Sequence, residues 1–98
     1  MARIELAPEV GDDFDRILEH LHQFEVAGAG VRIEEILQGI SVLEFNPFIG
    51  RRARADLREL VIGHQSRGYV ALYRYVPEID IVFVLAIRSQ REAGYKRS

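Results

Sequence analysis

The chain has 98 residues, of which 48% are hydrophobic and 29% are charged. This length is typical of one domain covering residues 1–98, and the composition favours a globular fold over a disordered segment. The absence of cysteine excludes disulfides and thiolate metal sites. The first residues quickly turn acidic and lack the apolar core of a secretory signal, so we expect a cytoplasmic protein.

The net charge of −2 conceals an unequal distribution along the chain. Residues 1–47 contain three arginines and ten carboxylates (3 − 10 = −7), whereas residues 48–98 contain ten basic and five acidic side chains (10 − 5 = +5). A basic half on a mildly acidic chain favours a surface that faces a negatively charged partner. The competing interpretation is that the two halves neutralise each other within the fold.

The first half of the chain predicts a short strand followed by two helices. Residues 3–7 alternate between polar and apolar side chains and are followed by a proline, which indicates a strand. Apolar residues recur at helical spacing over residues 10–24 and again over residues 33–43, with a glycine-containing break at residues 28–30. The second helix is expected to end at Asn46-Pro47. Neither helix carries an obvious set of chemical groups, so we expect a helical hairpin whose role is packing.

The second half predicts three strands. A basic loop over residues 48–54 precedes strands at residues 57–62 and 69–76, and the most apolar run of the chain, residues 81–87, predicts a strand buried on both faces. The order is therefore β-α-α-β-β-β. We expect an α+β fold in which the helical hairpin packs on one face of a small, mostly antiparallel sheet.

Several short motifs occur in a characteristic order along nearly the whole chain. They are Asn46-Pro47-Phe48-Ile49-Gly50-Arg51, Leu57-Arg58-Glu59-Leu60, Gly68-Tyr69-Val70-Ala71-Leu72-Tyr73-Arg74, Val82-Phe83-Val84-Leu85-Ala86-Ile87-Arg88 and Gln90-Arg91-Glu92. In order, spacing and length, the chain resembles the RelE/ParE superfamily of toxins from type II toxin–antitoxin systems, which are often called plasmid stabilisation proteins.

The resemblance implies a bacterial toxin that is neutralised by a cognate antitoxin encoded beside it. RelE-like members act on the ribosome and cleave mRNA, whereas ParE-like members inhibit DNA gyrase, and the target of this chain stays open between the two. Neither mechanism implies a cofactor, a metal or a membrane partner. The alternative is a non-toxic family member that serves as an interaction or co-repressor module together with its antitoxin.

For a RelE-like member, the resemblance implies a catalytic end formed by Arg88, Arg91 and Tyr95. Cleavage of RNA without a metal needs groups that accept a proton, stabilise the phosphate and protonate the leaving oxygen. Arginine suits the phosphate, and a tyrosine or histidine suits a proton transfer. Arg67 and His64 are weaker candidates from the turn before residue 69. The register of Arg67 and the short spacing before Tyr95 both depart from the RelE pattern.

A second basic group lies in and beside the predicted basic loop. Its members are Arg51, Arg52, Arg54 and Arg58. They are candidates for contact with nucleic acid or with a protein target, and the competing interpretation is a solvated basic loop. The low net charge and the Asn46-Pro47 stretch favour a ParE-like member over a RelE-like one.

Other residues are better explained by structure than by chemistry. Tyr69, Tyr73 and Tyr75 alternate along one predicted strand, which favours a packing stripe. His20 and His22 are two residues apart on a helix, so they point in different directions and do not make a metal pair. The short strand at residues 3–7 is expected at an edge of the sheet, where an antitoxin segment would dock.

Overall fold

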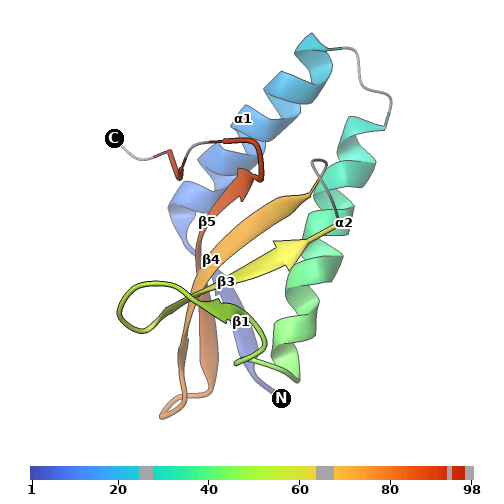
Figure 1. Ribbon diagram of the computed structural model, residues 1–98. Coiled ribbons are helices and arrows are strands. Elements are labelled where there is room, and N and C mark those ends of the chain that lie inside the picture. The colour runs from blue at the N-terminus through green and yellow to red at the C-terminus, as the bar shows by residue number, and fades with distance from the viewer. Residues whose placement is uncertain (25–27, 64–67, 93, 97–98) are drawn as a thin grey trace.

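The computed structural model describes residues 1–24, 28–63, 68–92 and 94–96. In this part of the chain, two helices pack against one five-stranded sheet (Figure 1). The elements in chain order are β1 (Arg3–Leu6), α1 (Pro8–Gln23), α2 (Ala29–Ser41), the 3₁₀ turn η1 (Val42–Glu44), β2 (Arg51–Arg52), β3 (Leu57–Ile62), β4 (Tyr69–Val76) and β5 (Ile81–Ser89). The predicted α+β class is confirmed. The short strand β2 lies where the sequence predicts only a basic loop.

The strands follow the order β1-β5-β4-β3-β2 across the sheet. Strand β1 runs parallel to β5, and the other neighbouring pairs are antiparallel. The predicted edge position of the first strand is therefore confirmed, and β2 forms the opposite edge. Strand β5 is an inner strand, in agreement with its being the most apolar run of the chain.

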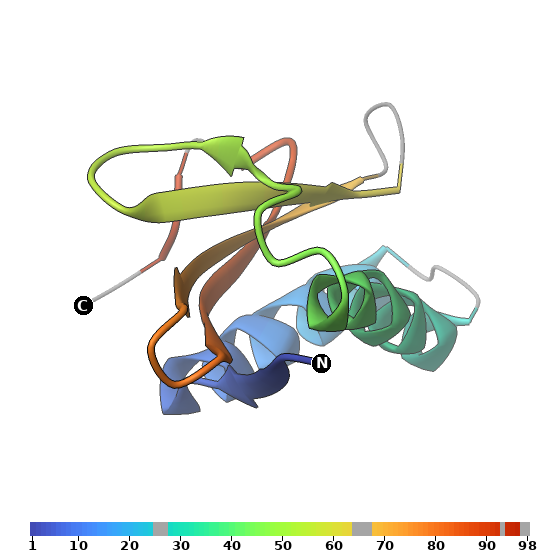
Figure 2. The same ribbon diagram turned by 90° about the horizontal axis from the view of Figure 1, so that it is seen from below.

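Both helices lie on the same side of the strongly twisted sheet (Figure 2). The core between the two layers is formed by fully buried side chains from each, among them Ile36, Leu43, Tyr73, Val82, Val84 and Ile87. Tyr69 and Tyr73 belong to this core, and Tyr75 packs against it. The packing role predicted for the tyrosine stripe is confirmed. Phe83 and Leu85 remain partly exposed, however, so the prediction that this strand is buried on both faces is wrong for these two residues.

Tyr73 also fixes the loop that leads into β2. Its hydroxyl donates a hydrogen bond to the backbone oxygen of Pro47 (2.8 Å) and accepts one from the backbone N–H of Gly50 (2.9 Å). Burial raises the pKa of the Tyr73 phenol. A Cβ atom at residue 50 would lie 2.6 Å from the Tyr73 side chain, so this close approach requires glycine.

Asp13 and Arg16 join helix α1 to β5 beyond the point where β1 ends. The pairing of β1 with β5 stops at Val84, and the carboxylate of Asp13 accepts a hydrogen bond from the backbone N–H of Ile87 (2.9 Å). Arg16 donates to the backbone oxygen of the same residue (3.2 Å) and to Asp13 (2.8 Å). The two side chains therefore satisfy backbone groups that a neighbouring strand would otherwise pair.

Candidate functional site

Arg88 and Tyr95, two of the predicted catalytic residues, meet on the face of the sheet that the helices leave uncovered. Arg88 lies opposite Val70 in the register of β4 with β5, and the neighbouring pair Ala71 and Ile87 faces the helices, so Arg88 projects to the other side. The guanidinium carbon of Arg88 lies 5.1 Å from the centre of the Tyr95 ring. This distance is typical of a cation–π contact.

Glu59 of β3 is the third member of this group, and the sequence analysis did not single it out. Its carboxylate accepts a 2.7 Å hydrogen bond from the Tyr95 hydroxyl and a 3.1 Å hydrogen bond from Nε of Arg51. Nη2 of Arg88 lies 4.0 Å from the same carboxylate. We call Glu59, Arg88 and Tyr95 the tail cluster. The alternation of β3 could have indicated Glu59. Its neighbour Leu60 faces the core, so Glu59 points to the other face of the sheet, and it is an acid within a basic stretch.

The protonation states of the tail cluster follow from these contacts. The hydrogen bond from Tyr95 lowers the pKa of Glu59, the nearby Arg51 and Arg88 lower it further, and burial acts in the opposite direction. Burial and the hydrogen bond to Glu59 together raise the pKa of Tyr95 well above its usual range. At neutral pH the cluster therefore holds a carboxylate and a protonated phenol.

Nη1 of Arg88 has two hydrogen-bond partners within the chain, and Nη2 faces Glu59 at 4.0 Å. Nη1 donates to the backbone oxygens of Ser89 (3.1 Å) and Glu92 (3.3 Å), and the side chain is only 16% exposed. Its Nε is buried and has no hydrogen-bond partner within the described residues. Arg88 thus holds the turn that follows β5 and presents little of its guanidinium to solvent.

The remaining candidates at this end lie outside the tail cluster or outside the described residues. Arg91 is exposed in the turn after β5. The adjacent Glu92 pairs with Arg16 of α1 through two hydrogen bonds of 3.1 Å, which attaches the turn to the helix layer. His64 and Arg67 are not among the described residues.

Two of the four arginines of the second basic group are engaged in structural contacts. Arg51 pairs with Glu59 at 3.1 Å. Arg58 donates to the backbone oxygens of Phe48 (3.1 Å) and Gly50 (2.9 Å), and its guanidinium lies 5.1 Å from the centre of the Phe48 ring. Arg58 therefore holds the loop before β2, and Arg51 joins β2 to β3.

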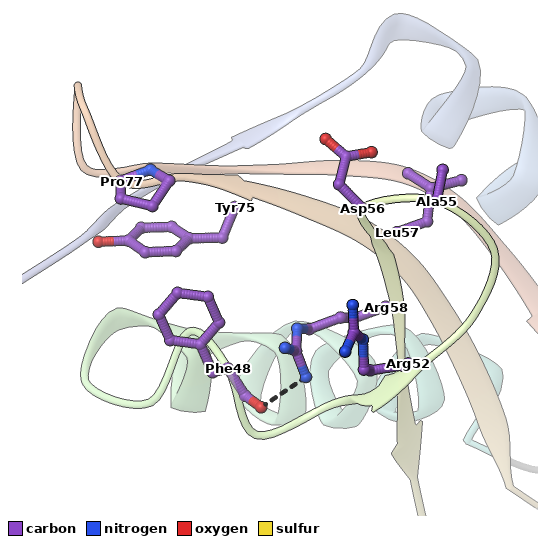
Figure 3. A pocket seen from close by; sticks show the side chains of 8 residues that line it. All are labelled: Phe48, Arg52, Ala55, Asp56, Leu57, Arg58, Tyr75 and Pro77. Carbon is purple, nitrogen blue, oxygen red and sulfur yellow. Dashed lines mark hydrogen bonds between the residues drawn. The ribbon is translucent and has the colours of Figure 1, made fainter.

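Arg52 and Arg54 are exposed, as Arg51 is, but they differ from Arg51 in their contacts. Within the described chain, neither forms an ion pair with a carboxylate. Arg52 lines a pocket of about 180 Å³ whose wall also includes Arg58 and the rings of Phe48 and Tyr75 (Figure 3). The structure thus distinguishes Arg51 and Arg58, which contact Glu59 or backbone oxygens, from Arg52 and Arg54, which pair with no carboxylate in the described residues.

The described residues meet the requirements of neither of two further features, a metal centre and a membrane-spanning helix. No group of three or more histidine, aspartate or glutamate side chains there has an arrangement that would hold a metal ion. No described helix combines the length and the apolar character needed to cross a membrane.

Comparison with known proteins matches the chain to one toxin family. Residues 4–94 match the family model described as the ParE toxin of the type II toxin–antitoxin system parDE. A relative named Toxin RelE3, from Caulobacter vibrioides, is 30% identical over 92 residues, which cover 94% of this chain and 98% of the relative.

Solved structures show the same fold at lower sequence identity. A structure described as the chromosomal ParDE system from P. aeruginosa matches with a TM-score of 0.73 and 19% identity, covering 91% of this chain and 96% of the other. The intact E. coli RelBE toxin–antitoxin complex matches with a TM-score of 0.62 and 18% identity, covering 94% and 100%. Together with the family match over residues 4–94, these findings show that the chain belongs to the ParE toxin family of type II toxin–antitoxin systems, within the RelE/ParE superfamily.

Proposed function

We propose that this toxin arrests growth by binding its target, DNA gyrase, and not by cleaving RNA. The observation that carries the proposal is that the Tyr95 hydroxyl and Nη1 of Arg88 are both engaged in contacts within the chain. The Tyr95 hydroxyl donates to Glu59 at 2.7 Å, and Nη1 of Arg88 donates to two backbone oxygens. The groups that a ribonuclease would direct at its substrate are engaged in holding the C-terminal segment on the sheet.

The chemistry of the tail cluster supports binding over catalysis. A general acid or base works best when its pKa lies near the operating pH, and the raised pKa of Tyr95 moves it further from neutrality. A phosphate brought to Arg88 would also approach the Glu59 carboxylate, and the repulsion between like charges opposes such binding. Both effects disfavour the predicted nuclease role of Arg88 and Tyr95.

We further propose that the chain is neutralised by a cognate antitoxin. The similar solved structures are described as the ParDE system and as the RelBE toxin–antitoxin complex. Strand β1 has an unpaired edge within the described sheet and is the place where we expect an antitoxin segment to add.

A RelE-like ribonuclease is the second candidate. The contact between Arg88 and the Tyr95 ring favours it, because it places a cation and a phenol together at the predicted catalytic end. A non-toxic interaction or co-repressor module is the third candidate and predicts no growth arrest.

Induction of the chain alone in bacteria separates these candidates. We expect growth to stop, with an SOS response and DNA double-strand breaks, and growth to resume when the antitoxin gene is expressed as well. Purified toxin should inhibit supercoiling by gyrase and leave mRNA intact on ribosomes. New mRNA 5′ ends at codon positions would instead support the ribonuclease, and unimpaired growth at high expression would support the non-toxic module.

A further inference from the structure

The pocket near the end of β4 combines an apolar wall with a cationic one. Figure 3 shows the rings of Phe48 and Tyr75 on one side and the guanidinium groups of Arg52 and Arg58 on the other. The two rings meet edge to face with their centres 5.1 Å apart, and Pro77 extends this side of the pocket. Such a pocket can take an apolar side chain and an anionic group together.

The cationic wall carries an uncompensated charge. Arg52 of β2 lies directly opposite Arg58 of β3 in the register of the two strands. Like charges in this position are unfavourable, and within the described chain neither arginine pairs with a carboxylate. Asp56 also lines the pocket, and its carboxylate pairs with Arg74 at 3.7 Å, not with Arg52 or Arg58. An anion supplied from outside would relieve this repulsion.

The wall formed by the loop between β2 and β3 has a defined conformation. The backbone N–H of Ala53 donates to the oxygen of Leu57 (2.9 Å), and the N–H of Leu57 donates to the oxygen of Arg54 (3.0 Å). Ala55 adopts a φ of 53°, a left-handed conformation that is costly for a residue other than glycine. Because this loop is already shaped, a ligand would not have to order it.

Large apolar side chains are exposed around the same end of the molecule. Phe48 and Ile49 are each 57% exposed, and Phe45 is 73% exposed. Ile79 lies in the turn between β4 and β5 and is also 57% exposed. The Tyr75 hydroxyl of β4 donates to Asp80 in this same turn, which joins the turn to the pocket wall. An apolar surface beside exposed arginines resembles the centre and rim of a protein interface.

We propose that this pocket docks an acidic segment of a protein partner. An apolar side chain of the segment would pack against the joined rings of Phe48 and Tyr75, and flanking carboxylates would pair with Arg52 and Arg54. This inference rests on the proposed function, in which the toxin acts by binding, and it identifies where the target is held and by what chemistry. A nucleic acid would satisfy the arginines but would leave Phe45, Ile49 and the other exposed apolar side chains uncovered.

The binding test uses synthetic probes and the purified full chain. The main probe is a fluorescently labelled peptide with one phenylalanine between two pairs of glutamates. The matched probes replace the phenylalanine by alanine or the glutamates by lysines, and a labelled oligouridylate represents nucleic acid. We expect Arg52→Glu to weaken binding of the acidic phenylalanine peptide by about tenfold or more and to improve binding of the lysine peptide. The control variant is Lys96→Glu, which reverses an exposed cation that does not line the pocket and should leave the affinities unchanged.

Two results would overturn the pocket as a docking site. One is an affinity for the acidic peptide that Arg52→Glu and Phe48→Ala both leave within about twofold of the original value. The other is binding of the oligouridylate that is tighter than that of the peptide and is lost in Arg52→Glu.

Growth assays separate this inference from the proposed function. We expect Arg52→Glu to abolish growth arrest and Lys96→Glu to retain it, with unchanged thermal unfolding in both variants. Full growth arrest by Arg52→Glu with the gyrase phenotype intact would reject the pocket alone. mRNA cleavage by the original chain would reject the proposed function, whatever the peptide measurements show.

Discussion

At the scale of single residues, Glu59 connects the basic group to the C-terminal segment. Its carboxylate is the common partner of Tyr95, Arg51 and Arg88. Replacement of any one partner would leave the others in place, whereas loss of the carboxylate removes the shared acceptor. We therefore expect stability to be more sensitive at Glu59 than at the exposed arginines around it.

Glu59 should make stability depend on pH in the acidic range. Its pKa is lowered in the folded chain, below an unfolded value of about 4.3. The stabilisation is therefore complete above the unfolded pKa and is lost as the pH falls through the folded pKa. We predict that Glu59→Gln is less stable than the original chain at pH 7 and that the difference shrinks toward pH 3, as measured by urea unfolding. A difference that grows on acidification would contradict this role.

Tyr73 provides a second test at this scale. Tyr73→Phe removes the hydroxyl that joins Pro47 and Gly50, and it leaves the N–H of Gly50 without that partner. We predict a loss of about 1–3 kcal/mol in the free energy of unfolding. The matched control is Tyr75→Phe, whose hydroxyl donates to Asp80 at the surface and whose loss should barely change the unfolding curve. Equal effects of the two changes would contradict the structural role of Tyr73.

At the scale of elements, the junction between α1 and β5 depends on a buried carboxylate. Asp13 is 1% exposed and binds both Arg16 and the backbone N–H of Ile87. Arg16 also donates two hydrogen bonds to Glu92, so one network joins helix α1, the inner strand β5 and the turn that follows it. This network positions the segment that carries Tyr95.

We predict that Asp13→Ala destabilises the fold by about 1–3 kcal/mol, because it leaves the backbone N–H of Ile87 without its acceptor and removes one of the partners of Arg16. Amide hydrogen exchange of Ile87 should become faster in this variant. Asp13→Asn keeps an oxygen for that N–H and should show a smaller change in exchange. Unchanged protection of Ile87 in Asp13→Ala would show that the network does not hold the strand.

The sequence predicted the elements whose patterns are local and missed the contacts that join distant residues. The alternation of Tyr69, Tyr73 and Tyr75 correctly indicated a core-facing stripe, because strand periodicity is readable over a few residues. The Asp13 bond to Ile87 joins residues 74 positions apart, and the Tyr95 bond to Glu59 joins residues 36 positions apart. No periodicity encodes such pairs.

The polar and apolar pattern of the sequence also did not predict very short or irregular elements. Strand β2 has two residues, Arg51 and Arg52, which is too few for any alternation to show. Strand β5 shifts register against β4 next to Tyr73, so a simple alternation does not describe which of its residues are buried. The contacts that distinguish Arg51 and Arg58 from Arg52 and Arg54 also depend on the folded arrangement, so the sequence pattern did not show them.

At the scale of the whole molecule, acidic and basic side chains gather in different places. Many carboxylates lie on the helices, whereas the basic group lies at the β2 edge of the sheet. Arg16 with Glu92 joins the two halves of the chain, and Arg52 and Arg54 are left at the surface. Because Arg16 belongs to the acidic half and Glu92 to the basic half, this pair does not neutralise the excess charge of either half, and the surface that faces a negatively charged partner stays a prediction.

The most direct test of the central claim is growth arrest by Tyr95→Phe, alone and combined with Arg91→Ala. The phenylalanine keeps the ring beside Arg88 and removes the proton that a nuclease would transfer. If the toxin acts by binding, both variants should stop growth as the original chain does, with an SOS response and no new mRNA 5′ ends. Loss of growth arrest together with loss of mRNA cleavage, in variants that remain folded and still bind antitoxin, would contradict the account and establish the tail cluster as a catalytic site.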